Sequence, residues 1–240
     1  MSRIVFLLLS LIVFLSSEAL DLSGRRLVWV RHGSTDWNWR MMGGGVRDLP
    51  INKEGEEYVG FVARAIVKAG IEPEFISSSP LLRCINTAEI IQKEYSEGKG
   101  KVLPIIVNKG LSGPDFGHWQ VESDSQISLI IKEIEKLGLS DADSKKILVD
   151  RMRSIPISGQ EDLQDFRKRI YGAVVDIAAQ TRGDVVLIGH GSSCEEFLNF
   201  LGKRDEVSQT YWSKFNRPPL VVSGEKLNVS LIEELNDKAD

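Results

Sequence analysis

The amino-acid sequence predicts an α/β fold, a three-layer α/β/α sandwich built on a mainly parallel sheet. Short apolar runs typical of buried strands alternate with longer amphipathic segments typical of helices. Histidine or arginine side chains follow closely on three of the apolar runs. The 240 residues are 42% hydrophobic and 27% charged, the composition of a globular chain long enough for one domain with a sizeable core.

The first 19 residues form a separate segment. Arg3 precedes an apolar run over residues 4–15, and small residues follow it up to Ala19. This layout is typical of a secretory signal peptide cleaved after Ala19, and the run is short for a membrane span. An uncleaved anchor or a buried first strand is the alternative. We predict a signal peptide over residues 1–19, one domain over 20–240, and a secreted or secretory-pathway protein with no stable membrane anchor after cleavage.

The first half of the domain alternates strands with helices. Asn52 can cap a helix that ends at Gly70, with Phe61 among its inward-facing residues. Pro80 suits the first turn of a second helix, and a proline within the third apolar run favours an edge strand. The expected strands are 26–30, 75–77 and 102–107, and the expected helices are 52–70 and 81–95.

The second half begins with a glycine-containing loop over residues 109–120 and ends in a hairpin turning at Gly224. The run 184–189 is the strongest strand signal in the chain, and Ser192 or Ser193 can cap the helix after it. The expected helices are 127–137, 143–152, 161–180 and the segment ending at 201, and the expected hairpin strands are 220–222 and 227–232.

Three side chains suited to phosphate chemistry lie at or just beyond the ends of predicted strands. His32 and His190 follow two strands directly, and Arg83 lies in the first helical turn after a third. Ligands bind at the carboxyl edge of such sheets, so we expect the three to converge. Arg31 and Arg83 offer planar donor forks for phosphate or carboxylate oxygens, and a neutral imidazole at His32 can accept a phosphoryl group.

These residues could also have an ordinary structural role or bind a metal. Each alone is more often an ordinary surface or helix-start residue, whereas their joint placement favours a site. His32, His190 and Asp115 could together hold zinc, but the flanking arginines would repel a dication. We therefore expect no metal and no cofactor. The formal net charge of −4 gives no reason to expect a nucleic-acid partner.

The chain has two cysteines, Cys84 and Cys194. A disulfide between them would suit a secreted protein, but pairing requires a specific spacing of the two Cα atoms. The sequence leaves the pairing open and favours two buried free thiols.

Five segments resemble, in order, motifs of the histidine phosphatase superfamily, in its phosphoglycerate mutase-like branch. Residues 31–38, Arg-His-Gly-Ser-Thr-Asp-Trp-Asn, resemble its RHGxTxWN signature. The other four resemble DxPLTxxG, SSPLxRAxQTA, ESxxDFxxR and the late SHG motif, and they are residues 48–55, 78–88, 161–169 and 188–191. The matches cover nearly all of residues 25–195.

This resemblance implies a site and a reaction. His32 would be phosphorylated transiently, and Arg31, Arg83 and His190 would form the phosphate pocket with Asn38 assisting. A general acid, usually a glutamate, would protonate the leaving oxygen. The implied partner is a small phosphorylated substrate, while the oligomeric state is not predicted.

The sequence departs from the family pattern at two places. The position of the expected acid glutamate is occupied by Gly113, and the tentative replacement is Asp115, with Glu122 and His118 as other candidates. In the glycine-rich loop, Met42 and Gly44 stand where the family often has arginine and glutamine, and Arg40 and Arg47 are near enough in sequence to compensate.

Three functions follow from these observations. The first is a phosphomonoester hydrolase acting through a phosphohistidine on His32, with activity reduced if the acid is weak. The alternative is a phosphate-ester-binding pseudoenzyme with little turnover, because the acid glutamate is replaced by Gly113. A phosphoglycerate mutase ranks last, since a glycolytic enzyme would not be expected to carry a signal peptide and the longer insertions of that group are lacking.

Overall fold

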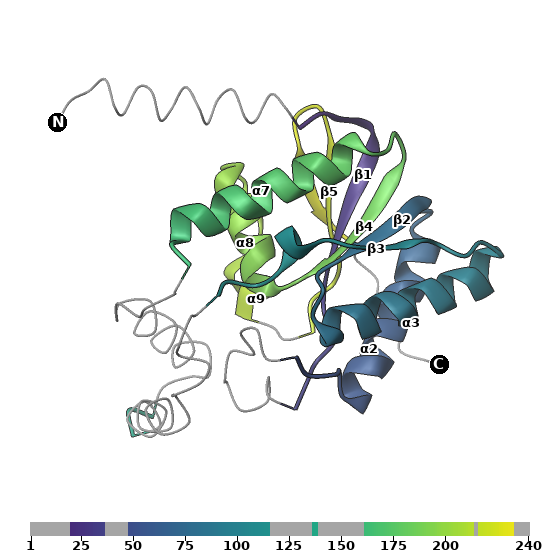
Figure 1. Cartoon of the computed structure of the whole chain (residues 1–240), viewed down its shortest axis with the longest axis horizontal. Coiled ribbons are helices and arrows are strands. Elements are labelled where there is room, and N and C mark those ends of the chain that lie inside the picture. Colours follow the sequence, from purple (N-terminus) through teal and green to yellow (C-terminus); the bar gives the residue numbers. More distant parts are fainter. Residues whose placement is uncertain (1–19, 37–47, 116–135, 139–160, 214–215, 233–240) are drawn as a thin grey trace.

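A six-stranded, mainly parallel sheet forms the centre of the protein (Figure 1). The computed structural model describes residues 20–36, 48–115, 136–138, 161–213 and 216–232. The strand order is β3-β2-β4-β1-β5-β6; the pairs among the first four strands are parallel, and β5 and β6 add antiparallel pairs at one side. The strands are β1 (Leu22–Arg31), β2 (Pro73–Ser78), β3 (Ile105–Val107), β4 (Asp184–Gly189), β5 (Leu220–Gly224) and β6 (Asn228–Leu231).

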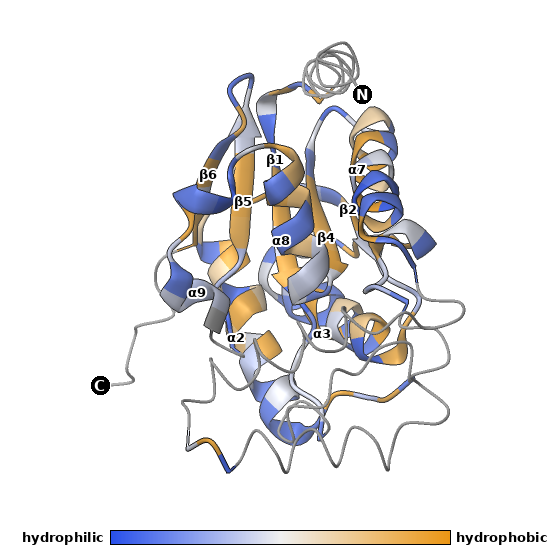
Figure 2. Cartoon of the chain, turned by 90° about the vertical axis from the view of Figure 1, so that its left-hand side faces the viewer, coloured by the Kyte–Doolittle hydropathy of each residue, from blue (hydrophilic) through white to orange (hydrophobic). Residues whose placement is uncertain are grey.

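Helices cover both faces of the sheet, which confirms the predicted three-layer α/β/α sandwich (Figures 1 and 2). Each face has its own apolar core, because successive side chains of a strand point to opposite sides. One face packs against α2 (Lys53–Lys68) and α3 (Leu82–Lys99). The other packs against α7 (Leu163–Ala179), α8 (Gly191–Phe200) and α9 (Gln209–Ser213). Among the described helices, none combines the length and the apolar character needed to cross a bilayer.

Most predicted elements in the described ranges form, with small changes in their bounds. The Asn52 side chain caps α2 by accepting a hydrogen bond from the Gly55 N–H, as predicted. The predicted edge strand is β3, at the border of the sheet. Phe61 was expected to face inward, and this is wrong: its side chain is 54% exposed, and α2 instead buries Val59 and Ala63. The buried side of α2 therefore keeps the predicted Val62, Ala65 and Ile66 and adds Val59 and Ala63.

The start of α8 differs from the predicted one. His190, rather than Ser192 or Ser193, occupies the N-cap position, and its side chain makes no capping hydrogen bond. Ser193 lies inside the helix, where its hydroxyl donates to the Ser112 carbonyl at 3.0 Å. This shift leaves the His190 imidazole directed to other partners. The short elements η2 (Lys109–Leu111), η3 (Arg204–Glu206) and α9 were not predicted.

Several predictions fall outside the described residues. These are the signal peptide over 1–19, the two helices expected over 127–137 and 143–152, apart from a turn at 136–138, and the glycine-rich loop.

Both cysteines lie within the described residues. Cys84 and Cys194 are both buried and free, and they belong to the cores on opposite faces of the sheet. The sheet between them prevents a disulfide, which agrees with the favoured reading of two free thiols.

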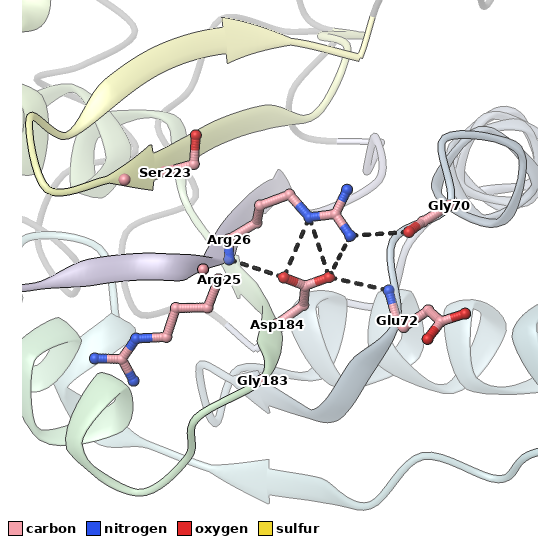
Figure 3. Close-up of a pocket in the computed structure, with 9 residues that line it drawn as sticks. Arg25, Arg26, Gly70, Glu72, Gly183, Asp184 and Ser223 are labelled. Carbon is pink, nitrogen blue, oxygen red and sulfur yellow. Dashed lines mark hydrogen bonds and ion pairs between the residues drawn. The ribbon is translucent and has the colours of Figure 1, made fainter.

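An ion pair joins three segments at the amino edge of the parallel strands (Figure 3). The Asp184 carboxylate accepts hydrogen bonds from the Arg26 backbone N–H, from the Arg26 guanidinium at 2.6 Å and from the Glu72 backbone N–H. Arg26 also donates to the Gly70 carbonyl. A hollow of about 480 Å³ lies over these residues. The contacts tie β1, β4 and the α2–β2 connection together, so we assign them to stability.

Replacing Asp184 by alanine should therefore lower the free energy of unfolding by about 2–4 kcal/mol, because two backbone donors and a guanidinium lose their common acceptor. Urea unfolding followed by circular dichroism measures this change. Asp165 is a matched control, because its carboxylate is 72% exposed and only 3.8 Å from Lys168. Its replacement by alanine should leave the unfolding midpoint unchanged, since exposed pairs contribute little. Equal effects at the two positions would contradict this role of Asp184.

Candidate active site

His32 lies directly after β1, at the carboxyl edge of the parallel strands, with 7% of its surface exposed. Its Nδ1 is 2.8 Å from the Gly33 carbonyl oxygen, and its backbone N–H donates to the Gly189 carbonyl at 3.0 Å. A carbonyl oxygen only accepts, so Nδ1 carries the proton. The Nε2 atom therefore holds the lone pair, as a nucleophile requires.

Two glycines allow the turn after His32 to pack against α2. A Cβ atom on Gly33 would lie 2.9 Å from the Gly55 carbonyl oxygen, and one on Gly55 would lie 2.5 Å from the Ser34 carbonyl oxygen. Both distances are shorter than a side chain tolerates, so the backbones approach as only glycine allows. Asn52 strengthens the contact, because its backbone N–H donates to the Ser34 carbonyl at 2.8 Å. The turn is thus held in place by the first turn of α2.

His190 lies directly after β4 and is 5% exposed. The centres of its ring and the His32 ring are 5.1 Å apart, at an interplanar angle of 62°. Its Nδ1 is 3.4 Å from the Arg83 Nη2, and its Nε2 is 3.2 Å from the Ser79 hydroxyl. A guanidinium only donates, so Nδ1 is the unprotonated nitrogen in this arrangement and Nε2 carries the proton. The predicted convergence of His32, His190 and Arg83 is therefore present.

The arginines come from two different elements. Arg31 is the last residue of β1, and Arg83 lies in the first turn of α3 with 3% of its surface exposed. The Thr87 hydroxyl donates to the Arg83 carbonyl at 2.7 Å and accepts from the Gly33 N–H at 3.0 Å. Thr87 thus joins the α3 turn that carries Arg83 to the turn that carries His32. Sequence reasoning gave no role to Ser79 or Thr87, although both belong to the segment 78–88 that resembles a family motif.

Burial and positive charge act together on the site. Burial, and then the nearby charge of Arg217, lower the pKa of Arg31 to about 9. The pKa of His32 is well below its usual value, mainly through burial and then through His190 and the arginines. Burial and the charge of Arg83 lower the pKa of His190 in the same direction. Both imidazoles are therefore neutral at pH 7 in a positively charged surrounding that suits an anion.

Acidification should destabilise the protein through these two histidines. Above pH 6.5 each is neutral in the folded and the unfolded chain, so neither affects the free energy of unfolding. Below pH 6.5 the two histidines bind protons in the unfolded chain but stay neutral in the folded protein. The free energy of unfolding then falls by up to about 1.4 kcal/mol per pH unit for each histidine. Urea unfolding at pH 8.0, 6.5 and 5.5 measures this fall.

Variants separate the site histidines from the carboxylates that also titrate on acidification. His190→Asn should make the fall in stability below pH 6.5 shallower, because one of the two depressed groups is removed. His32→Asn should have the same effect, because it removes the other depressed group. An identical slope in the wild type and in His190→Asn would contradict the assignment.

The loop after β3 brings Gly113 to the site. A Cβ atom on Gly113 would lie 3.4 Å from Cγ of His190, so this position faces the imidazole. Arg169 of α7 holds the loop, because its guanidinium donates to the Ser112 and Gly113 carbonyls, each at 3.1 Å. Glu161 pairs with Arg169 through two contacts of 2.7 Å. The position where the family pattern has an acid is therefore firmly placed, and it has no side chain.

Asp115, the tentative acid, lies farther along the same loop and is exposed. Its backbone pairs with Glu161, which donates to the Asp115 carbonyl at 2.9 Å. Gly113, two residues earlier, faces His190. Asn38, His118 and Glu122 lie outside the described residues. Within the described ranges, no three histidine, cysteine, aspartate or glutamate side chains gather closely enough to hold a metal ion.

Curated relatives of the chain are similar over most of its length. It is 27% identical over 220 residues to a 2,3-bisphosphoglycerate-dependent phosphoglycerate mutase of Parvibaculum lavamentivorans, covering 88% of this chain and 91% of that protein. It is 25% identical over 185 residues to the uncharacterised phosphatase PhoE of Bacillus subtilis, covering 75% and 79%. Mutases and phosphatases are thus both among the relatives.

Solved structures share the fold. The phosphoglycerate mutase of Bacillus anthracis superposes with a TM-score of 0.62 at 19% identity, covering 88% of this chain and 92% of that one. A mycobacterial glucosyl-3-phosphoglycerate phosphatase, crystallised with VO3, gives a TM-score of 0.58 at 24% identity, covering 87% and 97%. The family model of the histidine phosphatase superfamily, branch 1, matches residues 27–211. This match spans well over half of the chain and includes both site histidines, so the protein belongs to the histidine phosphatase superfamily.

Proposed function

We propose that the protein is a phosphomonoester hydrolase that works through a phosphohistidine on His32. The observation that carries this proposal is the arrangement at the carboxyl edge of β1 and β4. A neutral His32 has its lone pair on Nε2, and Arg31, Arg83 and His190 surround it. Phosphatases among the similar structures and relatives support the same activity.

The reaction would take place in two steps. Nε2 of His32 attacks phosphorus, the bond from phosphorus to the ester oxygen breaks, and the alcohol leaves. Arg31 and Arg83 stabilise the charge on the other phosphate oxygens during the transfer. Water then attacks the phosphohistidine, the P–N bond breaks, and inorganic phosphate is released. Asn38 would assist in binding the phosphate, as the resemblance implies.

The leaving oxygen needs a proton in the first step unless it belongs to a good leaving group. We propose Asp115 as the donor, since it lies two residues from Gly113 on the loop that faces His190. Its side chain is exposed, and its backbone pairs with Glu161. Asp115→Asn should then slow alkyl phosphates more than aryl phosphates. An equal effect on both would remove Asp115 as the acid.

Turnover of a graded series of aryl and alkyl phosphates tests the proposal. We expect release of phosphate from p-nitrophenyl phosphate and competitive inhibition by vanadate, with rates that fall steeply as the leaving group becomes more basic. Rapid quenching with a radiolabelled substrate should trap an alkali-stable phosphohistidine. The wild-type protein would contradict the proposal by hydrolysing no member of the series.

A pseudoenzyme is the second candidate, and Gly113 is the observation that favours it. Without an acid beside His190, phosphate esters would bind while turnover stays low. Vanadate binding measured by calorimetry, with no phosphate release from any ester, would identify this case.

The mutase hypothesis is supported by the names of several relatives. It predicts conversion of 3-phosphoglycerate to 2-phosphoglycerate in the presence of 2,3-bisphosphoglycerate, which a coupled assay detects.

We also propose that the protein enters the secretory pathway. The charged and apolar pattern of residues 1–19 supports this, and the buried Leu20 would become the first residue after cleavage. Expression of the full chain in a secreting host, followed by amino-terminal sequencing of the medium, should find Leu20 first. Full-length chain retained in the membrane fraction would contradict the proposal.

A further inference from the structure

A third arginine lies beside the site, and no sequence motif pointed to it. Strand β5 runs antiparallel to β1, with Trp29 opposite Leu220. The residues just before β5 therefore lie beside the end of β1, where Arg31 and His32 stand. Arg217 is one of these residues, and only 8% of its surface is exposed.

The Arg217 side chain is held in place from several sides. Its Nη2 donates to the Trp212 carbonyl, and its guanidinium carbon lies 5.4 Å from the centre of the Trp212 ring and 5.7 Å from that of Tyr211. A Cβ atom on Gly191 would lie 2.7 Å from its Nη1. Since Gly191 directly follows His190, the guanidinium is fixed against the first residue of α8, at the same edge as the two histidines.

Arg217 and Arg31 place two positive charges near each other in a partly desolvated region. The Arg217 charge contributes to the lowered pKa of Arg31, next after burial. Like charges repel more strongly where water is excluded, and α8 adds the positive end of its dipole. An anion bound here would be attracted by both charges.

Tyr58 supplies a hydroxyl in the same neighbourhood. The charges of Arg31 and Arg217 both act on it, and its buried oxygen has no hydrogen-bond partner among the described residues. A buried hydroxyl without a partner costs free energy, which a ligand oxygen that accepts its hydrogen bond would recover.

We propose that Arg217 and Tyr58, together with Arg31, form a second anion subsite beside the phosphate pocket, on its β5 side. The preferred substrates would then be phosphomonoesters that carry a second acidic group, either a carboxylate or another phosphate. Arg31, at the end of β1, would contact both groups of such a substrate. This inference rests on the proposed hydrolase and names its substrate class.

The test compares substrates with and without the second acidic group. Glycerol 3-phosphate has none, phosphoserine and 3-phosphoglycerate carry a carboxylate, and fructose 1,6-bisphosphate carries a phosphate. In Arg217→Met, we expect KM to rise about 10–100-fold for the substrates with a second acidic group, the effect of losing a charged hydrogen bond. KM for glycerol 3-phosphate should change less than about twofold. Tyr58→Phe should give a smaller effect with the same selectivity.

Arg204 offers a matched control. Its guanidinium also lies over Trp212, 5.5 Å from the ring centre, but it pairs with Glu195 at 3.1 Å. Arg204→Met therefore removes an arginine–Trp212 contact of the same kind without removing the proposed subsite. It should leave the substrate preference unchanged. Thermal unfolding of all variants identifies any that fail to fold. The variant Arg217→Lys keeps the positive charge and should therefore retain part of the substrate preference.

Two results would overturn the inference. One is an equal loss for both substrate groups in a folded Arg217→Met protein, which would assign Arg217 to the scissile phosphate or to the fold. The other is the absence of any preference in the wild type. If the wild type hydrolyses nothing, the proposed hydrolase fails separately. Calorimetric binding of 3-phosphoglycerate and of glycerol 3-phosphate to the wild type and Arg217→Met then decides the subsite by the same comparison.

Discussion

Replacing His32 by alanine should abolish hydrolysis of p-nitrophenyl phosphate. The variant loses the Nε2 lone pair that attacks phosphorus, while Arg31, Arg83 and His190 stay in place. Loss of a nucleophile typically costs about 10⁴–10⁶-fold in turnover, so activity should fall to the background rate. Release of p-nitrophenol, followed by absorbance, measures this fall, and the trapped phosphohistidine should disappear with it.

The fold of this variant can be checked independently of its activity. The His32 backbone N–H still donates to the Gly189 carbonyl, and the Gly33–Gly55 contact is untouched. Vanadate should therefore still bind, more weakly, because the arginines remain. Arg204→Met, at an arginine that pairs with Glu195, is the control and should keep full activity. Unchanged activity in His32→Ala would contradict the assignment of His32 as the nucleophile.

Placing a glutamate at Gly113 should raise turnover of alkyl phosphates by about 10²–10⁴-fold, the usual contribution of general acid catalysis. The position faces His190, and a Cβ atom there would make an ordinary contact of 3.4 Å. Arg169 already holds the loop through the Gly113 carbonyl. Aryl phosphates should gain much less, because their leaving groups need no proton. Initial rates on an alkyl and an aryl phosphate measure both effects.

Gly113→Gln is the matched control for this gain. Glutamine has the same size as glutamate but cannot donate a carboxyl proton, so it should leave the alkyl phosphate rate at or below the wild-type value. A similar gain in both variants would mean that bulk at this position, rather than an acid, increases the rate. No gain from glutamate would mean that another residue already supplies the proton.

Local patterns were enough to predict most of the fold. Strand β4 has the predicted bounds because a continuous apolar run is buried on both faces. Helix α2 begins at its predicted cap because the Asn52 side chain and the following N–H groups are neighbours in sequence. The prediction for Phe61 was wrong because the same apolar pattern is compatible with several rotations of the helix about its axis. Which side of α2 faces inward depends on the close approach of Gly55 to the Ser34 backbone, and that is a property of the packed pair.

Local sequence is enough to identify the family-like motifs, the strand ends that carry Arg31, His32 and His190, and the absence of a glutamate at position 113. Each of these follows from residues adjacent in the chain. Only the tertiary structure decided that Gly113 faces His190 and that Asp115 lies beside Glu161. It also brought Arg217 next to Arg31, although 185 residues separate them in the sequence. The physical reason is that these contacts depend on the pairing of distant strands and on the loops that follow them, which no local pattern records.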